Sequence, residues 1–117
     1  MTAPIGELAY IIIDCNDNQK VAEFWSSLLG LAIHKVNPPY IDLEAAPGIP
    51  RLSFQAIAEK KCGKNRLHLD IKVSDLDVAK SKAELLGARL VEDHHYKKWR
   101  WLTMADPEDN EFCLIND

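Results

Sequence analysis

Apolar and polar residues alternate most regularly near the middle of the chain, over residues 66–73. Leu67, Leu69 and Ile71 occupy one set of alternate positions, and polar residues occupy the other. Because successive side chains of a strand point to opposite faces, this pattern predicts a strand with Leu67, Leu69 and Ile71 packed against a helix. The opposite face then carries a cation, an imidazole and a carboxylate: Arg66, His68 and Asp70.

The first half of the chain shows two further patterns. A β-branched run over residues 8–15 predicts a well-buried strand. Apolar residues then recur at three- and four-residue steps over 18–29, which predicts a helix with Asp17 as its N-cap and Gly30 at its end. Prolines and a glycine separate the short strands that we expect to follow, at 33–36, 40–43 and 52–57.

The second half repeats this order of elements. After the strand at 66–73, Asp75 is placed to cap a helix near 75–86. A strand then starts at 89–91, and further strands follow at 99–104 and 111–115. The halves also align residue by residue, since Leu28-Leu29-Gly30 matches Leu85-Leu86-Gly87. The strands match one residue further along, because the loop between strand and helix differs by one residue: Tyr10 falls on His68, and Gln55 falls on Cys113. The sequence therefore predicts an α+β fold of two tandem β-α-β-β-β modules.

Length and composition agree with one soluble domain. The chain has 117 residues, of which 47% are hydrophobic and 27% charged, as in ordinary globular proteins. We expect a single domain over 1–117, with one module at about 5–58 and the other at about 64–117. The net charge of -4 and the lack of a basic cluster argue against nucleic acid or an anionic membrane as a partner.

Targeting signals and cysteines bear on location. No apolar run approaches the ~18 residues of a membrane span, and the first residues lack the pattern of a signal peptide. The three cysteines, Cys15, Cys62 and Cys113, are odd in number and lack the spacing of a metal finger. They fit a reducing cytoplasm better than a disulfide framework, so we expect a cytoplasmic protein.

His68 and Asp70 are the candidates for acid–base chemistry. They stand two residues apart on one face of the predicted strand, where Asp70 can orient His68 and raise its basicity, as in a general base. Two structural interpretations remain open beside this catalytic one. His68 can be a hydrogen-bonded histidine that lines a polar cleft, and Asp70 can form a structural pair with Arg66 or with a residue of another strand.

Other chemically distinctive residues have structural interpretations too. We expect Cys113 to be a small buried apolar residue, because no fixed cation is placed to lower the pKa of its thiol. Trp101 shares a strand face with Trp99, so either ring can stack on a flat ligand or simply pack. His94 and His95 are adjacent on a predicted strand, so their side chains diverge, and we expect both on a solvated hairpin.

Several motifs together resemble one known family. They are Phe24-Trp25 with Leu28-Leu29-Gly30, the run Lys64-Asn65-Arg66-Leu67-His68-Leu69-Asp70, Leu86-Gly87-Ala88, and Met104 to Glu108 with Asn110 to Cys113. In this order the chain resembles the short glyoxalase-like branch of the vicinal oxygen chelate superfamily, which includes glyoxalases, bleomycin-resistance proteins and extradiol dioxygenases. The resemblance implies two curled mixed sheets, each with an outer helix, that enclose a concave cleft. It also implies a homodimer.

The resemblance further implies a divalent metal ion in the cleft of the family's metalloenzymes. Carried over to this sequence, its four ligand positions are Tyr10, Gln55, His68 and Cys113, whereas the family's usual ligands are mostly His and Glu. A neutral phenol and a neutral amide are poor ligands for Ni, Mn or Fe, and His68 with Cys113 makes at most half of a zinc site. We therefore expect no cofactor, with a divalent metal as the less favoured alternative.

Two classes of function follow. The first is a small-molecule-binding protein of the bleomycin-resistance type, with a degenerate metal site and a polar cleft centred on His68. The second is a metal-dependent lyase, isomerase or dioxygenase of the same superfamily. In either class the small organic ligand stays unidentified, and the residues expected to line its cleft are Tyr10, Gln55, Arg66, His68, Trp101, Glu111 and Cys113.

Overall fold

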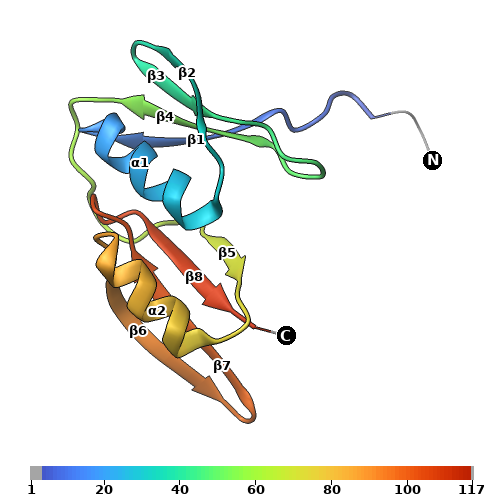
Figure 1. Ribbon diagram of the computed structural model, residues 1–117, viewed down its shortest axis with the longest axis vertical. Coiled ribbons are helices and arrows are strands. Elements are labelled where there is room, and N and C mark those ends of the chain that lie inside the picture. The colour runs from blue at the N-terminus through green and yellow to red at the C-terminus, as the bar shows by residue number, and fades with distance from the viewer. Residues whose placement is uncertain (1–3, 117) are drawn as a thin grey trace. The chain divides into compact units, whose positions relative to one another are not determined.

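The computed structural model describes residues 4–116 and divides into two compact units of similar architecture (Figure 1). The first module ends at Ala58, and the second begins at Glu59. Each contains one helix and one four-stranded mixed sheet that stays open at both edges. The predicted α+β fold of two tandem β-α-β-β-β modules is therefore confirmed.

The first module contains β1 (Tyr10–Cys15), α1 (Asn18–Leu29), β2 (Ile33–Asn37), β3 (Tyr40–Leu43) and β4 (Arg51–Ala56). Its strands lie in the order β1-β4-β3-β2, with β1 parallel to β4 and the other pairs antiparallel. Helix α1 packs on one face of this sheet (Figure 1). Trp25 and Phe24 of the helix, with Phe54 and Leu43 of the sheet, are almost fully buried and form the core.

The second module repeats this arrangement with β5 (Leu69–Lys72), α2 (Leu76–Leu85), β6 (Arg89–Tyr96), β7 (Trp99–Ala105) and β8 (Glu111–Ile115). The strand order is β5-β8-β7-β6, and β5 runs parallel to β8. Leu102, Met104, Phe112 and Leu114 are fully buried on the face that α2 covers (Figure 1). Because side chains alternate along each strand, the intervening residues lie on the opposite face.

Capping residues take the positions that the sequence predicts. Asp17 accepts a hydrogen bond from the Lys20 amide at 3.2 Å, and Asp75 accepts one from the Val78 amide at 3.0 Å. Gly30 ends α1 in the left-handed conformation, with φ of 68°, which costs little without a Cβ atom. Asp109 also adopts a positive φ of 68° in the turn before β8, a conformation that aspartate tolerates better than most residues.

Two expectations about strands were wrong. Residues 66–68 lie outside β5, and the side chain of Leu67 is 69% exposed rather than packed against a helix. The side-chain amide of Asn65 donates hydrogen bonds to the backbone carbonyl oxygens of Leu67 and Glu111. The backbone bends at this point, just before β5 begins. Strand β1 is not buried throughout either, because Tyr10 and Ile12 are 49% and 48% exposed. They alternate with residues that face α1, so β1 has only one covered face.

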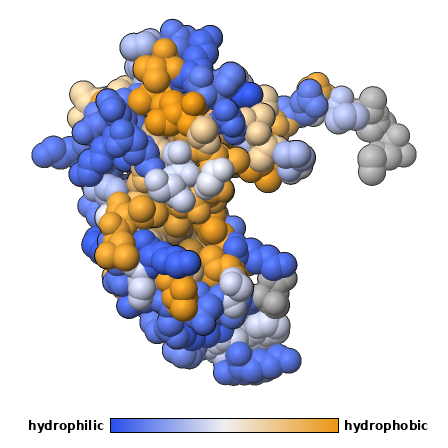
Figure 2. All heavy atoms as spheres, in the orientation of Figure 1, coloured by the Kyte–Doolittle hydropathy of each residue, from blue (hydrophilic) through white to orange (hydrophobic). Residues whose placement is uncertain are grey.

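The end of the second module that carries the β6–β7 turn is coloured mainly hydrophilic at the bottom of Figure 2. The aromatic side chains of Tyr96 and Trp99, which flank this turn, are also exposed there. Among the described residues, no helix has both the length and the apolar character needed to cross a membrane.

Candidate functional site

Polar side chains form a row across the second sheet, on the face that α2 leaves uncovered. Asp70 of β5 pairs with Cys113 of β8, and Cys113 pairs with Thr103 of β7. Thr103 in turn pairs with Glu92 of β6. Strand register therefore places two carboxylates, a thiol and a hydroxyl side by side, and each comes from a different strand.

His68 extends this row just before β5. Its ring nitrogen Nδ1 lies 3.1 Å from Asp70 Oδ1 and 3.9 Å from Cys113 Sγ. The imidazole and the carboxylate are each about half exposed, with 50% and 47% of their side-chain surface accessible. The predicted juxtaposition of His68 and Asp70 is present, and the pair is accessible to a ligand. The carboxylate of Asp70 therefore has His68 as its partner, rather than the expected alternative Arg66.

Cys113 lies beneath this pair and is 6% exposed. Burial raises the pKa of its thiol, and this effect outweighs the opposing hydrogen bond with Thr103, whose Oγ1 is 3.5 Å away. The nearby charge of Asp70 raises the pKa further. The thiol therefore stays protonated near neutral pH, as expected of a small buried residue rather than a nucleophile.

His94 lies on the β6–β7 hairpin, where the sequence analysis expected it, but its side chain is only 26% exposed. Its Nε2 is 2.9 Å from Thr103 Oγ1, and its Nδ1 is 3.2 Å from Glu92 Oε2. Its ring stacks on Trp101 with a centroid distance of 4.9 Å and an interplanar angle of 6°. Pairing of β6 with β7 brings these rings together, so Trp101 stacks on a neighbouring side chain within the protein.

His95 takes the opposite direction, as strand alternation predicts. Its Nε2 lies 3.2 Å from Asp93 Oδ1, and its side chain is 66% exposed. The two adjacent histidines therefore belong to different faces of β6.

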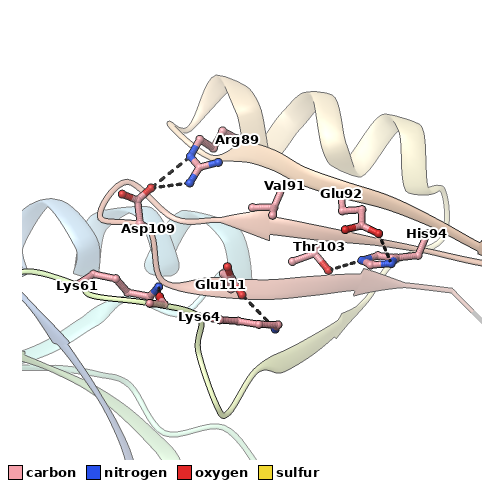
Figure 3. A pocket seen from close by; sticks show the side chains of 10 residues that line it. Lys61, Lys64, Arg89, Val91, Glu92, His94, Thr103, Asp109 and Glu111 are labelled. Atoms are coloured by element: carbon pink, nitrogen blue, oxygen red, sulfur yellow. Dashed lines mark hydrogen bonds and ion pairs between the residues drawn. The ribbon is translucent and has the colours of Figure 1, made fainter.

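A groove of about 520 Å³ opens beside His94 (Figure 3). Ion pairs line it: Arg89 Nη2 is 3.0 Å from Asp109 Oδ1, and Lys64 Nζ is 3.4 Å from Glu111 Oε1. Because cations and carboxylates are matched in number along its wall, the groove suits a polar organic molecule rather than a strongly charged ion. Its lining consists of Lys61, Gly63, Lys64, Arg89, Val91, Glu92, His94, Thr103, Asp109 and Glu111.

The remaining expected cleft residues lie in three different settings. Glu111 begins β8 and lines the groove, with its side chain 16% exposed. Arg66 is exposed in the bend before β5, outside the β5–β8 ladder in which we expected it. Tyr10 and Gln55 belong to the first module, at the beginning of β1 and near the end of β4.

Strand register changes how the two modules correspond. Cys113 pairs with Asp70, whereas Gln55 pairs with Asp14, so register matches Asp70 with Asp14. His68 then corresponds to Ile12 rather than to Tyr10. Gln55 pairs with Asp14, whereas Tyr10 pairs with Arg51. Tyr10 is therefore four residues before the partner of Gln55, or roughly 13 Å away along the ladder. The first module therefore does not bring Tyr10 and Gln55 together as the second brings His68 and Cys113 together.

Comparison with known families decides the classification. Residues 10–115 match the family described as the glyoxalase-like domain. The chain belongs to this family. With its structural neighbours, the match places the glyoxalase-like chain in the vicinal oxygen chelate superfamily. No protein with a curated description matches the sequence.

Solved structures share the glyoxalase-like fold. A glyoxalase/bleomycin resistance protein/dioxygenase family enzyme from Burkholderia phytofirmans has a TM-score of 0.79 at 21% identity, with 95% of this chain and 98% of that chain covered. A genomically encoded fosfomycin resistance protein from Listeria monocytogenes has a TM-score of 0.78 at 13% identity, with 97% and 95% covered. A lactoylglutathione lyase from Agrobacterium tumefaciens has a TM-score of 0.69 at 14% identity, with 97% and 96% covered. At such identities the likeness shows the fold alone.

The metal ion that the family's metalloenzymes hold can be tested against this glyoxalase-like chain. Tyr10 and Gln55 offer a phenol and an amide, which are poor ligands, and they lie at opposite ends of the β1–β4 ladder. The register equivalent of His68 in the first module is Ile12, which has no donor atom. The four carried-over positions therefore do not fit a four-ligand metal site.

Sequence reasoning missed three residues of the polar face: Glu92, His94 and Thr103. A signal was available for the first two, because residues two apart on a strand share a face. Thr103 carries no such signal, since its place beside Cys113 depends on how β7 pairs with β8.

Proposed function

We propose that this glyoxalase-like protein binds a small organic molecule at the polar face of its second module, with His68 as the central polar contact. The observation that carries the proposal is the His68–Asp70 pair, 3.1 Å apart and half exposed, beside the buried thiol of Cys113. Histidine can donate a hydrogen bond, accept one and change charge near neutral pH. With Nδ1 held by Asp70, Nε2 is the nitrogen left for the ligand.

The groove beside His94 indicates the chemistry of this ligand. Its matched charges, together with Thr103 and Glu92 from one end of the polar row, offer both donors and acceptors over a volume of about 520 Å³. Such a wall suits a small organic molecule with several hydrogen-bonding groups. Glu111 belongs to the proposed lining, whereas roles for Tyr10, Gln55, Arg66 and Trp101 in ligand binding stay predictions.

A catalytic function of the same site is the second candidate. The 3.1 Å contact between His68 and Asp70 is the geometry by which a carboxylate orients a general base. It is compatible with a lyase, an isomerase or a dioxygenase, and one structural neighbour is itself described as a lactoylglutathione lyase. Conversion of a bound molecule by the wild-type protein would favour this candidate, and unchanged recovery of that molecule would favour binding alone.

The experiment compares wild-type protein with His68→Ala and His95→Ala. Native mass spectrometry of the wild-type protein identifies any molecule that co-purifies, and bleomycin and fosfomycin serve as defined probes in titrations. We expect His68→Ala to keep the circular dichroism of the wild type and to weaken binding at least about tenfold, the cost of one lost hydrogen bond to a charged or polar partner. His95→Ala is the matched control, because His95 is exposed on the other face of β6. Wild-type binding by His68→Ala would place the functional site elsewhere.

Assembly and location form a separate part of the proposal. We propose that two copies of the chain pair as a homodimer, because β1 is an edge strand with Tyr10 and Ile12 exposed to solvent, and Leu8 just before it is exposed too. We also propose a cytoplasmic location, which is supported by the free thiols of Cys62 and Cys113.

A further inference from the structure

Three potential metal ligands converge within the second module. Nδ1 of His68, a carboxylate oxygen of Asp70 and Sγ of Cys113 all lie within 4.8 Å of one another. Nδ1 is 3.1 Å from Asp70 Oδ1 and 3.9 Å from Sγ. Around a tetrahedral zinc ion, bond lengths of about 2.0–2.3 Å separate neighbouring ligand atoms by roughly 3.4–3.6 Å. Small side-chain adjustments therefore suffice to close these three atoms around one ion.

The strands hold these ligands in place. Asp70 and Cys113 pair directly in the β5–β8 ladder, so their side chains share one face. The thiol also lies 3.5 Å from Thr103 Oγ1, and that hydroxyl contacts His94 Nε2 at 2.9 Å. Such outer contacts orient a ligand and are typical of metal sites that proteins use.

We propose that His68, Asp70 and Cys113 bind one Zn²⁺ ion within the second module, without Tyr10 or Gln55. The donor set decides the metal, because a thiolate and an imidazole favour zinc or cobalt, whereas magnesium, calcium and manganese prefer oxygen ligands. Binding displaces the thiol proton of Cys113, and the neutral imidazole of His68 coordinates through Nδ1 with its own proton on Nε2, so that one proton leaves as the metal enters. The proposal goes beyond the proposed function, since it predicts a three-ligand site in which Asp70 joins two of the carried-over positions, His68 and Cys113.

Three protein ligands have two consequences. The fourth coordination position stays open to water or to a ligand, as in zinc sites that act on small molecules. His68 and Asp70 are also half exposed, so the metal can exchange with solvent. We therefore expect protein purified without added metal to contain well under one equivalent of zinc, and to take up one equivalent when zinc is supplied.

Cobalt provides the test, because a cobalt–thiolate bond gives a charge-transfer absorption that cobalt bound only through nitrogen and oxygen lacks. Chelator-treated full-length protein is titrated with Co²⁺ and then with Zn²⁺. We expect the band to saturate at one equivalent of cobalt and to disappear as zinc replaces it. Cys113→Ser should abolish the band, and Asp70→Asn should weaken cobalt binding at least about tenfold.

Control variants separate this site from other sources of the signal. Cys62→Ser removes the exposed thiol, and Tyr10→Phe and Gln55→Ala remove the carried-over family positions, so all three should keep the wild-type titration. Asp70 is exposed, so Asp70→Asn tests the site even if Cys113→Ser fails to fold. Four outcomes would overturn the proposal. The cobalt–thiolate band could be absent from the wild type, persist in folded Cys113→Ser or disappear in Gln55→Ala. Asp70→Asn could also bind cobalt with the affinity of the wild type.

The same protein distinguishes this inference from the proposed function. Bleomycin and fosfomycin binding is measured in chelator before cobalt is added. If the chelated protein binds a probe through His68 and shows no cobalt–thiolate band, the metal site is wrong and the proposed function stands. If the band appears but His68→Ala leaves probe binding unchanged, the metal site stands and the proposed ligand site is wrong.

Discussion

At the scale of single residues, burial separates side chains that look alike in the sequence. Leu67 and Leu114 are both leucines of predicted strands, yet Leu67 is 69% exposed and Leu114 is fully buried. Asn65 accounts for the difference, because its side chain bonds the backbone around Leu67 and ends the strand pattern there. Leu69, which we expected in the core with Leu67, is only half-buried.

This contrast gives a prediction about stability. Leu114→Ala should lower the free energy of unfolding by about 2–5 kcal/mol, since it opens a cavity beneath α2. Leu67→Ala should change it by less than about 0.5 kcal/mol, because an exposed side chain loses little contact. Urea unfolding followed by circular dichroism measures both values. Equal losses in the two variants would contradict the packing described here.

At the scale of elements, Arg100 of β7 ties α2 to the sheet. Its guanidinium lies 2.9 Å from Asp77 Oδ1 on α2 and 3.0 Å from Asp93 Oδ2 on β6. Hydrogen bonds from Arg100 are the main reason that the pKa values of Asp77 and Asp93 lie below their ordinary value of 3.8. One arginine thus connects three elements of the second module.

A dependence of stability on pH follows from these lowered pKa values. Above pH 3.8 both carboxylates are ionised in the folded and unfolded states, and the stabilisation by Arg100 is fully present. As the pH falls through the lower folded-state values, the folded protein must take up protons and this stabilisation is lost. Both carboxylates are exposed, so the effect should be modest and should shrink in high salt.

Two variants separate the effect of the Arg100 contacts from the effect of net charge. Arg100→Met should flatten the fall in unfolding free energy between about pH 5 and pH 2, measured by urea unfolding at each pH. Lys98→Met removes the same unit of charge from the adjacent turn and should leave the slope close to that of the wild type. If both variants flatten the slope equally, net charge rather than the Arg100 contacts is responsible.

At the scale of the whole molecule, the proposed homodimer makes a prediction about mass. Light scattering should give twice the 13.2 kDa of one chain, independent of concentration in the micromolar range. Ile12→Lys should shift the mass toward that of one chain, because it places a charge on the exposed apolar face of β1. Lys35→Glu on β2, at the far edge of the same sheet, is the control and should leave the mass unchanged. A single 13.2 kDa species for the wild type would exclude the dimer.

Much of the fold was predictable because it depends on local sequence. Helix α1 over Asn18–Leu29 and α2 over Leu76–Leu85 follow from apolar spacing, and Asp17, Asp75 and Gly30 mark their ends by their own side chains or backbone freedom. The internal repeat then predicted that, along the chain, each module has one strand, one helix and three further strands. These signals act within a few residues, so a sequence read by itself contains them.

The candidate site was predictable only in part. The sequence by itself placed His68 beside Asp70, because residues two apart on an extended segment share a face. The arrival of Cys113, Thr103 and His94 at the same face was decided by the pairing of β5, β8, β7 and β6, in which each contact joins residues far apart in the chain. Strand register also decided that Ile12, rather than Tyr10, corresponds to His68. A shift of one residue in any ladder would turn these side chains to the opposite face, and local sequence does not set that register.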